Sequence, residues 1–521
     1  MAPMVDTNNT NEQDACYLAL KARDARFDGR FFTGVTSTGI YCRPVCGVRT
    51  PTRENCRFFN HAANAESAGF RPCRRCRPEL APNSVAWSIQ DASSILTHQA
   101  ARLLDEPEAW GESALSVQSL AARLGVSDRH LRRIFESRLG VSPMQYLQTR
   151  RLLTAKQLLT DTDLPMVQVA LVSGYASVRR FNAAFVAHYR LNPTQLRRTG
   201  AGFSGRGICV RLGYRPPYDV AAMAAFLRQR QLHAIESVSC DGAPARIGKT
   251  LRVQGAGKVH CGWLVASFEP DHCQLVLQVS DSLRDVLPLV IRRVRNAFDL
   301  DADPQAINQV LQASFPGGDG LRVPGTFDGF ELAVRAVLGQ QITVAAARTL
   351  AQRLVDRFGD PIATPWPELS RLFPTAAVLA QATADDLGSL GIVKQRQRAI
   401  QALAQAVTHG GLQLGAGADV TATMAALVAL PGIGDWTAHY IAMRALRWPD
   451  AFPSADVALH KALGVVGQRH PAKEAEARSQ AWRPWRSYAV LRAWSGLPAP
   501  IRKDASRRPA RSRIDAADVV S

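Results

Sequence analysis

Four cysteines near the start of the chain have the spacing of a metal site. Cys42 and Cys46 form a C-x3-C pair, and Cys73 and Cys76 form a C-x2-C pair. Two such pairs supply the four thiolates that tetrahedral Zn²⁺ prefers, and reduced cysteines clustered in this way favour a metal over disulfides. We therefore predict one zinc ion held by these four residues. A closed four-thiolate site is usually structural, so a purely structural role is the simpler alternative.

Arginines are concentrated around these cysteines, which suggests that the zinc site faces an anion. Zinc keeps its sulfur ligands deprotonated, and a thiolate is the form of cysteine that attacks carbon. The arginines are Arg43, Arg49, Arg53, Arg57, Arg71, Arg74, Arg75 and Arg77.

A second candidate site lies between Leu430 and Asp456, in LPGIGDWTAHYIAMRALRWPDAFPSAD. Gly432 and Gly434 allow a tight backbone turn, and helical periodicity follows them, so several N–H groups should point outward at a helix N-terminus. Such a turn can bind a DNA phosphate, although an ordinary hairpin of two helices would have the same sequence pattern. The segment ends in a lone carboxylate, Asp456, which could be catalytic, could cap the helix that follows it, or could do both.

Two helical pairs between these sites have the pattern of helix-turn-helix units. Ser116–Phe135 and Met166–Phe185 each contain an apolar helix, a glycine turn and a second helix that carries basic residues. A single pattern of this kind also fits a helical packing module without DNA affinity, but two copies joined by an amphipathic helix are more specific. We expect the second helices to contact DNA through Arg129, Arg132, Arg133, Arg179 and Arg180, and to bury Leu131, Ile134, Phe181 and Phe185.

The composition agrees with a polyanionic partner. Among 521 residues, 63 Lys and Arg against 44 Asp and Glu give a formal net charge of +19. An excess of this size favours nucleic acid as the partner. Because no apolar run reaches the roughly 18 residues of a membrane span, we expect no membrane association and a cytoplasmic location.

The first two hundred residues resemble two known domains. GIYCRPVC, TRENCRFF and AGFRPCRRC resemble the N-terminal domain of the Ada family, in which the cysteine that matches Cys42 binds zinc and also accepts a methyl group from a DNA methylphosphotriester. Methylation would change the formal charge of the zinc site from −2 to −1 and lower its repulsion from phosphate. The two helix-turn-helix units, with the terminal YRLNPTQLRR, resemble the AraC-type DNA-binding domain. This resemblance implies a transcription regulator that works with RNA polymerase.

The rest of the chain resembles a DNA repair enzyme. RPPYD, FELAVRAVLGQQIT, LPGIGDWTAHYIAMRAL, FPSAD and WRPWRSYAVLRAW, in this order, resemble the AlkA-type alkylbase DNA glycosylases of the helix-hairpin-helix superfamily. The resemblance implies that Asp456 is catalytic and that aromatic rings bind a flipped-out cationic base by cation–π attraction. The matching aromatic residues are Trp436, Tyr440, Trp494 and Phe226.

Two further positions define the expected reaction. Family members that also cut the strand carry a lysine just after the hairpin glycines, and here that position is Trp436, so we expect base release without lyase activity. The family's DNA-intercalating leucine falls at Gln341, so the wedge that fills the gap in the duplex is predicted to be Gln341 or Ile342.

These observations predict a multidomain, mainly α protein with α+β parts. The expected parts are a disordered leader (1–14), a zinc methyl-acceptor domain (15–80), an AraC-type domain (85–199), a linker (200–206), a small α+β sheet domain (207–300), a helix-hairpin-helix glycosylase domain (301–498) and a disordered basic tail (499–521). We expect a monomer that senses alkylation, regulates transcription and releases 3-methyladenine-type bases from double-stranded DNA. In the alternative hypothesis, the chain is a regulator and scaffold whose glycosylase module binds DNA without excising a base.

Overall fold

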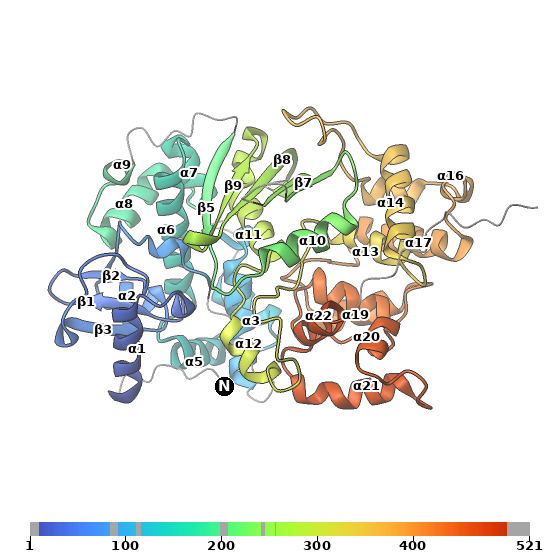
Figure 1. Cartoon of the computed structure of the whole chain (residues 1–521). Coiled ribbons are helices and arrows are strands. Elements are labelled where there is room, and N and C mark those ends of the chain that lie inside the picture. Colours follow the sequence, from blue (N-terminus) through green and yellow to red (C-terminus); the bar gives the residue numbers. More distant parts are fainter. Residues whose placement is uncertain are drawn as a thin grey trace, which may run out of the picture.

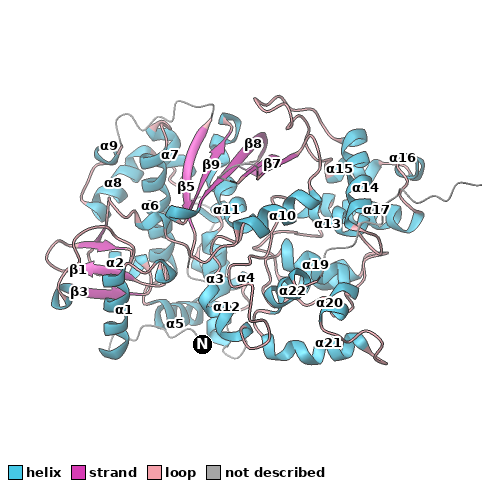
Figure 2. Cartoon of the chain, viewed as in Figure 1, coloured by secondary structure: helices cyan, strands magenta, loops and turns pink. Residues whose placement is uncertain are grey.

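The computed structural model describes residues 10–83, 92–110, 116–197, 207–240, 245–255 and 257–497. The predicted linker and the predicted tail from 499 on lie outside these residues, as do the first nine residues of the predicted leader. Helices dominate, and strands occur in two separate small sheets (Figure 2). The predicted fold class, mainly α with α+β parts, is confirmed. Within the described residues, no helix combines the length and the apolar character needed to cross a membrane.

The N-terminal domain is a four-stranded sheet with two helices. Its strand order is β3-β1-β2-β4, in which β1 is antiparallel to both neighbours and β2 runs parallel to β4. The first helix begins at Thr10, inside the predicted leader, because Cys16, Ala19 and Leu20 pack against Phe31 and Phe58. The elements are α1 (Thr10–Ala22), β1 (Phe32–Val35), β2 (Ile40–Cys42), β3 (Cys56–Phe59), α2 (Ala62–Ser67) and β4 (Arg71–Pro72).

The next segment contains the two helix-turn-helix units around a long central helix, α6. Serine side chains cap four of its helices: Ser116, Ser127, Ser142 and Ser177 each accept a hydrogen bond from a backbone N–H in the first turn. The helices are α3 (Ala92–Asp105), α4 (Val117–Arg123), α5 (Asp128–Leu139), α6 (Pro143–Asp161), α7 (Met166–Val172), α8 (Val178–Tyr189) and α9 (Pro193–Leu196).

An antiparallel sheet follows, with strand order β5-β9-β8-β7-β6. The sequence alternates as strands do at 207–218, 263–268 and 273–279 and has helical periodicity at 219–231 and 283–298, which predicts β5, β8, β9 and both helices but not β6 or β7. The elements are β5 (Ile208–Gly213), α10 (Val220–Arg230), β6 (Glu236–Ser239), β7 (Arg246–Gly255), β8 (Lys258–Glu269), β9 (Gln274–Val279) and α11 (Leu287–Ala297).

The remaining described residues form a helical domain, on the right in Figure 1. Two hydrophobic clusters lie within it, one around α13, α17 and α19 and the other around α12, α20 and α22. The helices are α12 (Pro304–Leu311), α13 (Gly329–Leu338), α14 (Val344–Phe358), α15 (Ala376–Gln381), α16 (Ala384–Ser389), α17 (Lys394–Thr408), α18 (Val420–Val428), α19 (Asp435–Arg444), α20 (Val457–Ala462), α21 (Pro471–Ser479) and α22 (Arg486–Ser495).

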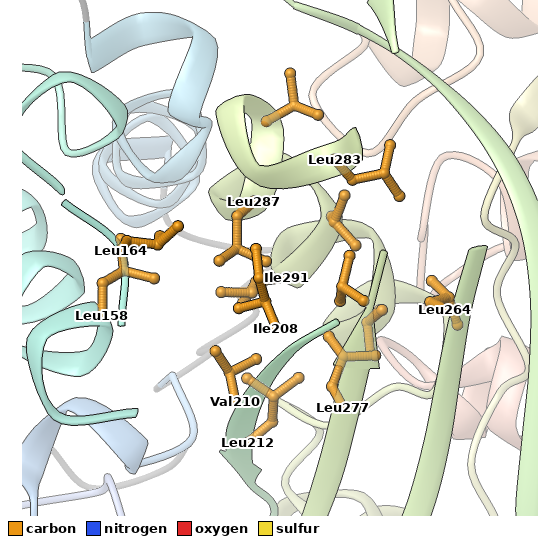
Figure 3. Close-up of a cluster of buried hydrophobic side chains, with 14 of the residues drawn as sticks. Leu158, Leu164, Ile208, Val210, Leu212, Leu264, Leu277, Leu283, Leu287 and Ile291 are labelled. Atoms are coloured by element: carbon orange, nitrogen blue, oxygen red, sulfur yellow. The ribbon is translucent and has the colours of Figure 1, made fainter. Parts of the chain in front are cut away.

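The second helix-turn-helix unit and the five-stranded sheet share one hydrophobic core. Leu158 and Leu164 of the helical side pack with Ile208 and other residues of β5, and with Leu287 and Ile291 from α11 (Figure 3). The two segments that the predicted linker connects are therefore packed directly against each other.

Candidate functional site

The four predicted zinc ligands meet at one edge of the N-terminal sheet. Cys42 ends β2 and Cys73 follows β4, and the parallel pairing of these strands brings the two cysteine turns together. The four sulfur atoms lie within 4.8 Å of one another. Tetrahedral coordination with Zn–S bonds of about 2.3 Å places sulfurs about 3.8 Å apart. The residues present therefore fit zinc, with Cys42, Cys46, Cys73 and Cys76 as its ligands.

Six of the eight arginines around this site separate into two groups. The sequence suggested that these arginines face an anion. Arg43 is instead buried and pairs with Asp28, and Arg77 pairs with Glu79 and Asp161, so neither side chain faces an external anion. Arg49, Arg57, Arg74 and Arg75 are exposed on the surface. The positive surface near the cysteines thus comes from the second group, while the first group holds the domain together.

The recognition helices α5 and α8 present their basic residues to solvent. Arg129, Arg132 and Arg133 are exposed on α5, and Arg179 and Arg180 are exposed on α8. The opposite faces are buried as predicted, through Leu131 and Ile134 on α5 and Phe181 and Phe185 on α8. Each exposed face is therefore available for a polyanion.

The second site is a cavity of about 840 Å³ between the sheet domain and the helical domain. Asp456 lines it from the N-terminus of α20, where its Oδ1 accepts a hydrogen bond from the Leu459 N–H at 2.6 Å. The indole N–H of Trp436 donates to Oδ2 at 2.8 Å, and that of Trp494 donates to Oδ1 at 3.0 Å. Asp456 thus caps a helix through the Leu459 N–H, and the two indole N–H groups also fix its carboxylate at the cavity wall.

The four aromatic residues predicted for the pocket all line this cavity. Trp436 and Tyr440 are one helical turn apart on α19, and their rings are stacked with centroids 5.4 Å apart and planes 12° apart. The ring of Trp494, on α22, lies 6.4 Å from that of Tyr440. Phe226, from α10 of the sheet domain, completes the wall and lies beside the Arg230 and Arg444 guanidinium groups. Half-buried rings of this kind offer flat faces to a planar ligand.

The predicted hairpin is formed by α18 and α19. Gly432 has φ +78°, in the left-handed region where glycine is favoured, and a Cβ there would lie 3.0 Å from the Ala399 Cβ. Gly434 has φ −91° and open space around it, so its backbone does not require glycine. Only one of the two predicted glycines is therefore needed for the turn itself, and the other caps α19.

The two predicted wedge residues lie in the loop between α13 and α14. Gln341 is exposed with φ +55°, whereas Ile342 is half-buried and lines the cavity. The neighbouring Gln340 ties this loop to the hairpin, because its amide donates to the Gly432 carbonyl and to the Thr437 hydroxyl, both at 2.9 Å.

Sequence reasoning missed the charged part of the cavity wall. Lys249 contacts Glu331 at 2.8 Å and Glu236 at 3.3 Å, and Arg335 pairs with both glutamates. Burial by itself raises the pKa of Glu236, but Arg335 and Lys249 outweigh it and lower that pKa to about 2. The i,i+4 spacing of Glu331 and Arg335 on α13 could have revealed one pair, but no local pattern points to Lys249 on β7.

Arg444 is a further residue that the sequence did not single out. Its Nη1 donates to the Tyr440 hydroxyl at 2.6 Å. Burial raises the pKa of Tyr440, but Arg444 and Arg230 outweigh burial and lower it. The cavity therefore combines aromatic faces with a polar rear wall.

Family models match four successive parts of the chain. They are described as the metal binding domain of Ada (residues 15–79), a helix-turn-helix domain (120–199), the AlkA N-terminal domain (209–328) and an HhH-GPD superfamily base excision DNA repair protein (334–487). The order of the matches is the order of the domains described above.

Known proteins match either most of the chain or one part of it. DNA-3-methyladenine glycosylase 2 of Escherichia coli is 34% identical over 54% of this chain and 95% of its own length. The bifunctional transcriptional activator/DNA repair enzyme Ada of E. coli is 38% identical over 26% of this chain and 36% of its own length. A protein of Mycobacterium tuberculosis, named probable bifunctional transcriptional activator/DNA repair enzyme AlkA, is 38% identical over 94% of this chain and 97% of its own length. The chain belongs to the family of this bifunctional transcriptional activator and DNA repair enzyme.

Proposed function

We propose that the chain is an alkylation-response protein that releases 3-methyladenine-type bases from double-stranded DNA. One observation carries the proposal. A single carboxylate, Asp456, is held by two indole N–H groups at the wall of an aromatic cavity of about 840 Å³. A flipped-out purine would fit such a cavity, and a cationic alkylated base is attracted to the faces of Trp436 and Tyr440.

The reaction needs only one carboxylate because the alkylated base is already cationic. When the bond between C1′ and the base nitrogen breaks, its electron pair stays on the nitrogen and neutralises the base, so no general acid has to donate a proton. Asp456 stabilises the positive charge that develops on the sugar or takes a proton from the water that attacks C1′. The products are the free base and an abasic sugar that carries a hydroxyl group.

The same geometry supports a glycosylase without lyase activity. A lyase needs an unprotonated amine that attacks C1′ and forms a Schiff base. Lys249 is the one lysine among the described residues that line the cavity, and its ammonium is buried between Glu331 and Glu236. These ion pairs engage the ammonium and hold it in the wall. Trp436 occupies the position after the hairpin where a lysine would be required.

The hairpin and the loop beside it are suited to hold the duplex. The exposed backbone around Gly432 and Gly434 at the start of α19 would bind a phosphate of the lesion strand. Gln341, exposed at the loop tip, is positioned to enter the gap left by the flipped nucleotide, while Ile342 lines the cavity. We assign the wedge to Gln341 for this reason.

The N-terminal half would act as the sensor and regulator. Zn²⁺ bound by the four cysteines would keep their sulfurs deprotonated at neutral pH. The Cys42 thiolate attacks the methyl carbon of a DNA methylphosphotriester, the C–O bond breaks, and its electrons return to the phosphate oxygen. A phosphodiester and a methyl thioether result, so each molecule accepts one methyl group. The exposed arginines of α5 and α8 would then bind promoter DNA and let the protein act on RNA polymerase as a monomer.

An excision assay tests the proposal directly. The full chain is incubated with a duplex that contains 3-methyladenine, and abasic sites are counted after alkaline cleavage. We expect wild-type protein to release the base and Asp456→Asn to do so about 10²–10⁴-fold more slowly, the range for loss of an acid–base group. Asp385→Asn is a matched control, because Asp385 is an exposed residue of α16 that does not line the cavity. Equal rates for wild type and Asp456→Asn would reject the enzymatic assignment. Strand cleavage before alkali is added would show that the protein has lyase activity, contrary to the proposal.

A further inference from the structure

Arg215 lies fully buried where the zinc domain, the start of the helix-turn-helix segment and the glycosylase half meet. Its guanidinium makes five hydrogen bonds, and each one goes to a main-chain carbonyl. The acceptors are Asp28 at 2.7 Å, Asp301 at 2.8 Å, Ala302 at 3.3 Å, Pro82 at 3.1 Å and Asn83 at 3.0 Å. One side chain thus joins three segments that are far apart in the sequence.

Arg215 is connected to the zinc ligands through Asp28 and Arg43. The Asp28 main chain accepts from Arg215, while its carboxylate pairs with the buried Arg43 guanidinium, at 2.8 Å from Nε. The backbone N–H of Arg43 lies 3.3 Å from the Cys76 sulfur, and its Nη1 donates to the Cys76 carbonyl at 2.9 Å. The position of Asp28 therefore depends on the turn that carries Cys76.

Arg215 is connected to the glycosylase cavity through Arg322. The Arg322 guanidinium donates to the Arg215 carbonyl and, at 3.0 Å, to that of Pro217. Arg322 is itself buried and lines the cavity, as do most residues of the segment 321–327. Its Nε and Nη1 are buried without a hydrogen-bond partner, so the guanidinium is held by these two carbonyls and by the Tyr218 ring, whose centroid lies 4.8 Å away.

The same segment continues to the proposed catalytic group. Arg444 donates to the Pro324 carbonyl at 2.8 Å and to the Gly325 carbonyl at 3.1 Å, and it also donates to the Tyr440 hydroxyl. Tyr440 stacks on Trp436, whose indole N–H holds Asp456. Segment 321–327 thus contacts the Arg215 junction at one end and the aromatic wall at the other, while Arg447 and Asp299 hold Val323 between them.

We propose that Arg215 is a positioning residue that couples the zinc–thiolate site to the glycosylase cavity, so that the state of the cysteine cluster sets the order of segment 321–327. This proposal rests on the proposed function of both sites. Loss of the metal would release the turn at Cys76, and with it Arg43, Asp28 and the first anchor of the segment. Coupling of this kind is reciprocal, so occupation of the cavity would also tighten the retention of zinc.

Hydrogen exchange in the full chain tests the coupling without any assay of activity. Backbone exchange over 321–327 is followed by mass spectrometry in zinc-loaded protein and in protein treated with a chelator. We expect zinc removal to speed exchange in this segment by about fivefold or more, the lower end of usual coupling strengths. Helix α17 is the internal reference, because the chain of contacts does not include it. An unchanged rate over 321–327, or an equal increase in α17, would overturn the proposal.

Variants then identify the residue that transmits the effect. In Arg215→Met, exchange over 321–327 should already be fast and should no longer respond to zinc. Arg102→Met is the matched control: Arg102 also joins the two halves, but the glycosylase carbonyls to which it donates, those of Ala416 and Leu446, lie outside segment 321–327. The Arg102→Met variant should keep the wild-type response of segment 321–327 to zinc.

A milder variant covers the case in which Arg215→Met fails to fold. Asp28→Asn removes the charge that pairs with Arg43 but leaves the Asp28 carbonyl in contact with Arg215, and it should reduce the zinc response at least by half. A full zinc response in Arg215→Met or, if that variant does not fold, in Asp28→Asn would contradict the proposal. If wild type showed the zinc response but released no base, the coupling would stand and the glycosylase assignment would fail. If wild type released the base while its exchange over 321–327 ignored zinc, the glycosylase assignment would stand and the coupling would fail.

Discussion

The zinc site and the glycosylase cavity hold an anionic group in opposite ways, the first through a metal and the second through neutral N–H donors. Four cysteine sulfurs lie within 4.8 Å of one another, and as thiolates they would need a metal to offset so much negative charge in so small a space. The single carboxylate of Asp456 is instead held by neutral N–H donors from Trp436, Trp494 and Leu459. Under the proposed function, the cysteine nucleophile is consumed once and can be locked in a closed cluster, whereas the carboxylate acts repeatedly and needs an open cavity.

The two sites also differ in how far apart their residues are in the sequence. The zinc ligands fall within residues 42–76, whereas the cavity draws on Phe226 at one end and Trp494 at the other. The first site therefore depends on its own small sheet, and the second depends on how two domains pack. Substitutions in each site test this contrast.

The largest expected effect is the complete loss of methyl uptake in Cys42→Ser. Serine keeps the shape of the side chain but has no thiolate to attack the methyl carbon. After incubation with duplex that contains methylphosphotriesters, mass spectrometry should find an added methyl on the wild-type peptide with Cys42 and none on the variant. Base excision should stay within about tenfold of wild type, because Asp456 and its donors are unchanged.

Cys209→Ser is the control, since Cys209 is partly exposed and is not a zinc ligand. Methyl uptake by Cys42→Ser at the wild-type level would show that another residue is the acceptor.

An intermediate effect is expected for Trp436→Phe, which keeps an aromatic ring but removes the N–H that donates to Asp456. Hydrogen bonds to charged groups contribute about 1.5–3 kcal/mol, so the single-turnover excision rate should fall about 10–100-fold while binding of DNA changes little. Trp494→Phe should have a similar effect through the other carboxylate oxygen. Trp448→Phe should not, because Trp448 stacks on His439 outside the cavity wall. Wild-type rates in both cavity variants would show that the indole N–H groups do not orient Asp456.

The smallest expected effect concerns a second carboxyl group, Glu66, which is buried, whereas Asp456 lies at the wall of an open cavity. Glu66 is buried between the zinc domain and the helix-turn-helix units, where it accepts hydrogen bonds from the hydroxyls of Tyr41, Thr149 and Tyr189. Burial raises its pKa from 4.5 to about 7. The folded state therefore binds this proton more tightly than the unfolded state, and the resulting stabilisation is present below pH 4.5 and is lost as the pH rises through 7.

Urea unfolding at about pH 5, 6 and 7 should reveal the stabilisation by protonated Glu66 as a difference between wild type and Glu66→Gln. The free energy of unfolding should fall with pH more steeply in wild type, by at most about 1.4 kcal/mol per pH unit. Glu54→Gln, at an exposed position, should keep the wild-type slope. Parallel slopes for wild type and Glu66→Gln would show that Glu66 does not retain its proton in the folded protein.

Sequence patterns predicted the elements whose signals are local. The glycine turns, serine caps and buried faces of the helix-turn-helix helices could be read directly, and so could the cysteine pairs. Strand β7 was missed because Lys249 and Thr250 interrupt its apolar pattern although both are buried. Their partners, Glu331 and the Arg371 carbonyl, lie far away in the sequence.

Local patterns also failed where the backbone conformation was unexpected. The residues from Phe327 to Phe358 have an almost wholly helical sequence pattern, but the helix is interrupted between α13 and α14. The left-handed residue at this break is Gln341, not the nearby Gly339, whose φ is −81°. Glutamine rarely adopts this conformation, so a glutamine at position 341 does not predict a break in the helix.

The amino-acid sequence by itself indicated the order of the four modules, the zinc ligands through residue type and short spacing, and the aromatic and acidic residues of the cavity through motifs that resemble a known family. Only the tertiary structure decided how Asp456 is held, which arginines are exposed and which are structural, and that the two halves share a core. Burial, ion pairing and contacts with main-chain carbonyls arise between segments that are distant in the chain. Arg215 shows this most clearly: a single arginine in the sequence becomes the centre of three segments only once the fold surrounds it.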